Sequence, residues 1–193
     1  MRRTTLAALA TLVLLPGLAG SQDGGDMTPQ QAMEIWKKWS TTDEHHKELA
    51  WYVGKWETET QITGMGTSKG TAEFKWVIEG RWLSETTQGS MMGMPFQGYR
   101  VTGFDRFKKK WVASSVSNLD TAMLRAEGVV VDPTGKVRVL WCNLDEYLTG
   151  EHDKTAKSVY RKIDDDTFIF ELWDMAIGPE GGKVAETTYK RKK

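Results

Sequence analysis

From Trp56 almost to the C-terminus, apolar and polar side chains alternate in short runs that are separated by turn residues. In the first run, which begins after Gly54, charged residues separate Trp56, Thr58 and Thr60. A period of two is typical of a half-buried β-strand. Glycine at position 54 provides the permissive backbone that a change from helix to strand needs. The pattern therefore predicts that most of the chain forms sheet.

About ten such runs follow one another, linked by short turns such as 132–135 (Asp-Pro-Thr-Gly) and 164–166 (three Asp). No helical pattern lies between them, which argues against a parallel sheet. We expect an all-β, antiparallel, up-and-down barrel, because closure leaves no exposed strand edge. A sandwich of two sheets remains the alternative. A barrel of this size can enclose one small ligand, and we place the methionine-rich segment 89–95 as a loop at its rim.

Two helices are predicted before the first strand. Thr28 and Gln31 form a capping-box pattern, and Thr41 with Glu44 repeats it. We expect this helical segment to cap one end of the barrel. The second helix, 45–52, is tethered directly to the first strand and should move little, whereas the first helix should be more mobile and can gate the barrel or cover a hydrophobic patch.

The N-terminus has the pattern of a signal peptide, which we assign to residues 1–21. Two arginines precede the apolar run Leu6–Leu15, and small residues follow it. The run is too short for an ordinary membrane span. We therefore expect an exported protein, periplasmic or secreted, with no stable membrane insertion after the signal is removed. The expected domains after it are a flexible leader with the first helix, 22–44, and the barrel, 45–193.

Composition restricts the partners and the means of stabilisation. The 26 basic residues balance the 26 acidic residues, which argues against a nucleic-acid partner because such a role needs a basic patch. Cys142 is the only cysteine, so no internal disulfide can form. The fold must be held by packing, to which nine tryptophans contribute large rings. The sequence leaves the oligomeric state open.

Seven short stretches occur in a characteristic order between about His45 and Arg191. They are Gly54-Lys55-Trp56, Gly80-Arg81-Trp82-Leu83, Met92-Gly93-Met94-Pro95-Phe96-Gln97-Gly98, Gly103-Phe104-Asp105, Lys110-Trp111, Glu127-Gly128 and Asp165-Asp166-Thr167-Phe168. Together they resemble the DUF1579 family, a lipocalin-like group of bacterial proteins of unknown function. The resemblance implies a lipocalin-like barrel and no established activity. It also implies that Trp56 closes the barrel base beside a basic residue of the last strand, Arg191 or Lys190, by cation–π stacking.

The sequence shows no metal or cofactor motif. His45 and His46 are adjacent, so on a helix they point in different directions, and His152 lies in a polar segment. Haem occurs in the related nitrobindin-type barrels, but this chain lacks a histidine in the late strands where a proximal ligand would be expected. Cys142 is interpreted as a small buried hydrophobe. We therefore expect no cofactor and no metal.

The leading hypothesis is that the barrel binds a small apolar or amphipathic molecule. Ligand pockets are walled mainly by aromatic and apolar side chains. The residues predicted to line the cavity are Phe74, Trp76, Trp82, Phe96, Trp141 and Phe170.

Two alternatives stay open at this point. The first is an enzyme, for example a hydrolase or isomerase, that uses titratable groups inside the barrel. Its candidate residues are Glu85, Arg81, Glu127, Arg125 and Tyr99. The second is a structural or protein-interaction domain with a filled core, because fold alone does not define function.

The predicted mobility of the first helix can be tested by deleting residues 22–40. The barrel should still fold, and it should bind more of the hydrophobic dye ANS because an apolar patch becomes uncovered. Circular dichroism and ANS fluorescence of the two proteins measure both effects. Global unfolding of the shortened protein would show instead that the first helix is part of the core.

Overall fold

The computed structural model describes residues 27–91, 93–147 and 149–193. The predicted signal peptide, the first residues of the leader and Met92 lie outside the described residues. The chain divides into two units, one ending at Thr41 and one spanning Thr42–Lys193. Within the described residues, no helix is long and apolar enough to cross a membrane.

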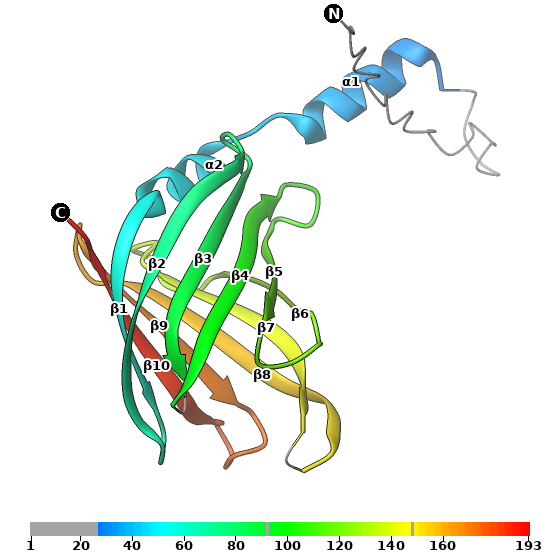
Figure 1. Ribbon diagram of the computed structural model, residues 1–193. Coiled ribbons are helices and arrows are strands. Elements are labelled where there is room, and N and C mark those ends of the chain that lie inside the picture. The colour runs from blue at the N-terminus through cyan, green and yellow to red at the C-terminus, as the bar shows by residue number, and fades with distance from the viewer. Residues whose placement is uncertain (1–26, 92, 148) are drawn as a thin grey trace, which may run out of the picture. The chain divides into compact units, whose positions relative to one another are not determined.

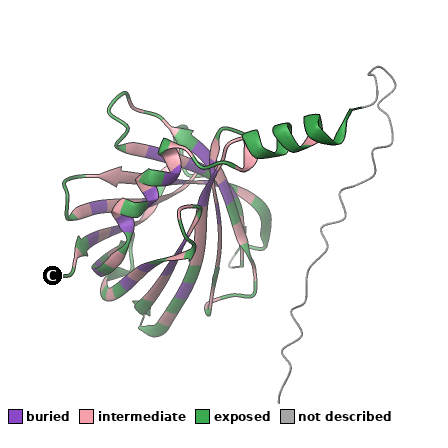
Figure 2. Ribbon diagram, turned by 90° about the horizontal axis from the view of Figure 1, so that it is seen from above, coloured by how far each residue is buried: buried purple, intermediate pink, exposed green. Residues whose placement is uncertain are grey.

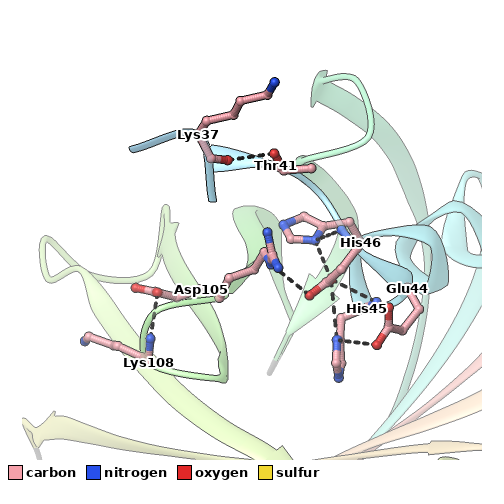
Figure 3. Close-up of polar contacts among 9 residues, drawn as sticks. Lys37, Thr41, Glu44, His45, His46, Asp105 and Lys108 are labelled. Atoms are coloured by element: carbon pink, nitrogen blue, oxygen red, sulfur yellow. Dashed lines mark hydrogen bonds and ion pairs between the residues drawn. The ribbon is translucent and has the colours of Figure 1, made fainter. Parts of the chain in front are cut away.

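Helix α1 (Pro29–Ser40) belongs to the first unit and begins with the predicted capping box. The Thr28 hydroxyl accepts a hydrogen bond from the Gln31 backbone, and the Gln31 side chain accepts one from the Thr28 backbone. At the other end, the Thr41 hydroxyl donates to the Lys37 carbonyl at 2.7 Å (Figure 3). No residue of α1 is buried, and the mobility of this helix stays a prediction.

The second unit contains a closed antiparallel barrel of ten strands (Figure 1). Each strand pairs with its neighbours along the chain, and β10 closes the barrel against β1, where Arg191 lies opposite Trp56. This confirms the predicted up-and-down barrel and excludes the sandwich. The strands are β1 (Gly54–Ile62), β2 (Gly66–Ile78), β3 (Trp82–Met91), β4 (Met94–Asp105), β5 (Lys110–Ser117), β6 (Leu124–Val130), β7 (Val137–Glu146), β8 (Glu151–Lys162), β9 (Thr167–Asp174) and β10 (Gly182–Arg191).

Buried and exposed residues alternate along the strands, as the bands of colour in Figure 2 show. In β1, Trp56 and Thr58 are buried whereas Glu57 is exposed, as the period of two predicts. The strand begins at Gly54, whose φ of 128° lies in a region that residues with a side chain rarely adopt. The predicted corner is therefore built on a glycine that the backbone requires.

Two strand boundaries differ from the sequence-based prediction. The segment 89–95 is not a loop, because β3 continues to Met91 and β4 starts at Met94. The polar segment that contains His152 is likewise not a loop, because β8 already begins at Glu151. In both places the ladder of the neighbouring strands continues through residues of low β propensity, because propensity is a weaker determinant than pairing in an existing sheet.

One end of the barrel is closed by helix α2 (Glu44–Leu49) and the short 3-10 helix η1 (Ala50–Tyr52), as Figure 1 shows. Leu49 and Tyr52 are buried there. They join an aromatic cluster that we call the aromatic plug. The plug comprises Trp51, Tyr52, Trp56, Phe74 and Phe168. This end of the interior is therefore filled by side chains.

Trp56 lies at the centre of the aromatic plug and is 0% exposed. Its indole nitrogen donates to the Tyr52 carbonyl at 2.8 Å. The guanidinium of Arg191 lies 4.2 Å from the centre of the Trp56 ring and donates to the backbone carbonyls of Trp51 and Val53. Arg191 is thus the basic partner that the family resemblance implied, and it joins the last strand to the helical cap.

Asp43 anchors the start of α2 to the barrel. Its carboxylate accepts a hydrogen bond from the His45 backbone, lies 2.9 Å from Nδ1 of His46, and forms an ion pair with Nε of Arg106 at 3.1 Å (Figure 3). Burial works to raise the pKa of Asp43, but the hydrogen bond with His46 and the nearby histidine charges lower it overall. The His45 ring stacks on Phe104 with centroids 4.0 Å apart. Both histidines therefore contribute to docking the cap.

Replacing the central ring of the plug tests this description of the closed end. We expect Trp56→Ala to lower the free energy of unfolding by about 3–5 kcal/mol, because it removes a fully buried large aromatic side chain. Denaturant melts of the two proteins measure the difference. Trp141→Ala is the matched control, since Trp141 is 48% exposed, and it should cost much less. Equal losses for the two variants would contradict the central role of Trp56.

Candidate ligand-binding cavity

The interior of the barrel holds a cavity of about 420 Å³. Its walls come from the strand ends that lie far from α2, next to the β1–β2, β3–β4 and β7–β8 turns (Figure 1). The aromatic plug fills the opposite end. The cavity therefore has one closed floor and one open mouth.

The floor of the cavity is polar. Glu85 on β3 lies directly opposite Arg100 on β4, and both side chains point inward with Tyr189 of β10 and Tyr160 of β8. The Tyr189 hydroxyl donates to Oε1 of Glu85 at 2.7 Å, and Nη1 of Arg100 donates to the Tyr160 hydroxyl. Nη1 also lies 3.7 Å from Oε2 of Glu85. We call these four residues the polar floor.

Burial controls the protonation of the polar floor. It raises the pKa of Tyr189 well above the usual value, and the charge of Glu85 adds to this shift. Burial also raises the pKa of Tyr160 to about 12, although Arg100 opposes the change. For Arg100, burial favours the neutral form, but Tyr160 and Glu85 outweigh it and raise the pKa. At neutral pH the two phenols are therefore protonated and Arg100 is a cation.

The walls above the polar floor are mixed. They contain threonines and serines as well as apolar side chains. Phe170 joins the walls to the polar floor, because the centre of its ring is 4.9 Å from the Arg100 guanidinium. At Gly98, a Cβ atom would lie 3.0 Å from the Phe96 ring, so the glycine leaves space for that ring. The larger apolar wall residues are Met91, Phe96, Val116, Met123, Leu124, Leu144, Phe170 and Leu172.

Charged residues surround the mouth, and most of them are acidic. The carboxyl groups are Asp120, Asp145 and Asp153, whereas Lys69 is the one basic residue among the described residues that line the cavity near its opening. Tyr147 lies beside them. The mouth therefore carries a negative charge while the floor carries a buried cation next to a carboxylate.

The six residues predicted to line the cavity are distributed over three regions. Phe96 and Phe170 line it. Phe74 belongs to the aromatic plug, and Trp76 is partly buried against the core. Trp82 and Trp141 lie on the outer face, where the Trp82 ring covers Gly103. Contact of these residues with a ligand stays a prediction.

The titratable candidates of the enzyme hypothesis are also separated. Glu85 lies in the polar floor, and Tyr99 borders the cavity with 43% of its surface exposed. Glu127 forms ion pairs with Lys108 and Lys110 on the outer face. The other two candidates, Arg81 and Arg125, are exposed.

Arg100, Tyr160 and Tyr189 were not among the candidate residues of the sequence analysis. A signal for one of them was present. Met91 pairs with Met94, and counting back along both strands places Glu85 opposite Arg100. The error of predicting a loop at 89–95 concealed this register.

No group of three His, Cys, Asp or Glu that could hold a metal ion occurs among the residues that the structure describes. Cys142 is buried, its thiol lies 3.6 Å from the Ala156 carbonyl, and burial raises its pKa despite the nearby Arg100 charge. A thiol in this state is a poor nucleophile.

Comparison with known protein families identifies the chain. The model of a family described as "Protein of unknown function (DUF1579)" matches residues 41–191. The chain belongs to the DUF1579 family. The match includes α2, η1 and all ten strands, so the cap and the cavity of this DUF1579 protein both lie within the family region. No curated protein matches the chain.

Several solved structures are similar to the chain. The crystal structure of Rv2717c from M. tuberculosis is 15% identical, with a TM-score of 0.56, and the match covers 79% of this chain and 100% of that one. A de novo designed fluorescence-activating β-barrel is 13% identical with a TM-score of 0.43, covering 75% and 96% of the two chains. The redesigned barrel mFAP1, bound to DFHBI, is 17% identical with a TM-score of 0.39, covering 74% and 97%. At 15% identity, the similarity to Rv2717c is one of fold.

The link between Tyr189 and Glu85 can be tested by removing one hydroxyl. We expect Tyr189→Phe to lower the free energy of unfolding by about 1–3 kcal/mol, because a buried carboxylate oxygen loses its hydrogen bond. The ring and its stacking on Phe168, at 4.1 Å between centroids, are retained. Tyr99→Phe is the control and should change stability by less than about 0.5 kcal/mol. A loss no greater than that of the control would show that the hydrogen bond contributes no net stability.

Proposed function

We propose that this DUF1579 protein is an exported binding protein that holds one small apolar or amphipathic molecule in its barrel. The observation that carries the proposal is the open cavity of about 420 Å³ with Phe96 and Phe170 in its walls. Ligand pockets in proteins have volumes of about 300–1,000 Å³ and combine apolar walls with a few polar groups. The signal-peptide pattern at the N-terminus supports export.

The cavity favours binding over the two other hypotheses. A filled core would leave no space between the aromatic plug and the mouth, whereas the cavity occupies that space. An acid–base enzyme would need a carboxyl group that is free to exchange a proton with its substrate. Glu85 instead accepts a hydrogen bond from Tyr189 through Oε1, and its Oε2 lies at ion-pair distance, 3.7 Å, from the Arg100 guanidinium. Such a floor is better suited to orienting a ligand than to transferring a proton.

The test is to fill the cavity with a side chain and measure binding of N-phenyl-1-naphthylamine, a neutral apolar fluorescent probe. Ser115 lines the cavity from β5 opposite Arg100, and Ser114 points to the outer face. We expect Ser115→Trp to weaken binding at least about tenfold because the indole takes the place of the probe. The neighbouring Ser114→Trp adds the same ring outside the barrel and should leave binding unchanged.

Thermal melts must show that both variants are folded. Equal affinity for the probe in the two variants would contradict binding inside the barrel. Failure of the wild-type protein to bind the probe at micromolar concentration would contradict the proposal as a whole.

A further inference from the structure

We propose that the ligand carries an oxyanion head group, a carboxylate or a close analogue, that binds the free edge of the Arg100 guanidinium at the polar floor. This inference rests on the proposed function, because it needs a ligand in the barrel. It goes further by naming the head group of the ligand and its orientation.

The first argument is the unused hydrogen-bonding capacity of Arg100. Its Nη1 donates to Tyr160 and faces Glu85. Across the described residues, no hydrogen bond of the guanidinium involves Nε or Nη2. These two groups lie on one edge of the planar guanidinium and donate in parallel, which is the geometry that binds a carboxylate through both oxygens. The Arg100 side chain is 19% exposed and lines the cavity, so the edge is within reach of a ligand.

The second argument is the charge balance of the polar floor. Glu85 lies 3.7 Å from Nη1, which is too far for a hydrogen bond, and its other oxygen accepts from Tyr189. Glu85 therefore does not satisfy Arg100 completely. A buried cation is stable when its remaining donors are hydrogen-bonded. A ligand oxyanion would supply that partner, whereas a purely apolar ligand would leave the two donors without one.

The third argument is the distribution of polarity along the cavity. The apolar wall residues, such as Phe96, Phe170 and Leu172, lie above the floor. The mouth has the carboxylates Asp120, Asp145 and Asp153, which would repel a second negative charge. The expected ligand is therefore a monoanion with one apolar part. Its head lies on Arg100 and its apolar part extends toward the mouth.

The experiment compares two competitors that differ only in the head group. Decanoate and 1-decanol are each titrated against bound N-phenyl-1-naphthylamine at pH 7.5, and the displacement of the probe is measured. We expect decanoate to bind about tenfold more tightly than decanol, because only the carboxylate can accept two charge-assisted hydrogen bonds from Arg100. Arg100→Met should retain the probe and lose this preference. Arg125→Met is the matched control and should keep the preference, because it removes the same charge from an exposed position outside the residues that line the cavity.

The outcomes separate the two proposals. If the wild-type protein does not bind the probe, both the proposed function and this inference are wrong. If the probe binds but decanoate and decanol compete equally, or if Arg100→Met keeps the preference, only the head-group assignment is wrong. If Arg100→Met does not fold, Arg100→Lys replaces it, since lysine keeps the charge without the two-donor edge. Arg100→Lys should bind the probe and lose most of the preference, and an unchanged preference would overturn the inference.

Discussion

The pairing of the last strand with the first is the constraint on which the rest of this structure depends. Because β10 hydrogen-bonds to β1, the sheet has no free edges, and every second residue of ten strands must point into one enclosed space. Arg191 of β10 strengthens this closure because its guanidinium donates hydrogen bonds to the Trp51 and Val53 carbonyls and lies over the Trp56 ring. Closure also brings residues from four strands together at the polar floor, although they are as much as 104 positions apart in the sequence.

The division of the interior into a plug and a cavity follows from which residues occupy the inward positions. Near α2 these positions carry large rings, and aromatic pairs at about 5–6 Å fill the space. Toward the other end many inward positions carry threonine or serine, and the larger side chains there, such as Phe96 and Phe170, leave a cavity between them. The polar floor lies between these two regions. A buried ion pair contributes little to stability when compared with apolar packing, which is one reason to connect Glu85 and Arg100 with binding.

The sequence predicted the architecture well because the alternation of side chains reports on each strand separately. The barrel, its strand number, the helical cap and the Arg191–Trp56 contact all follow from local patterns or from the family resemblance. The site was harder to predict because it depends on register between strands. Because segment 89–95 was predicted to be a loop, the strand register that places Glu85 opposite Arg100 was missed. Tyr160 and Tyr189 come from strands further along the chain and reach this pair only because the barrel closes. Trp82 and Trp141 were predicted to line the pocket because they are large and aromatic. Successive side chains of a strand point to opposite faces, and these two occupy positions that face away from the barrel interior.

Tyr189 belongs to both regions of the interior. Its ring stacks on Phe168 of the aromatic plug, while its hydroxyl holds Glu85 in the polar floor. A change at the floor therefore acts on the same side chain that packs against the closed end. A substitution that shifts the Phe168 ring and one that moves the Glu85 carboxylate would therefore both be felt by Tyr189. The floor of the cavity and the closed end of the barrel are thus built around one shared tyrosine.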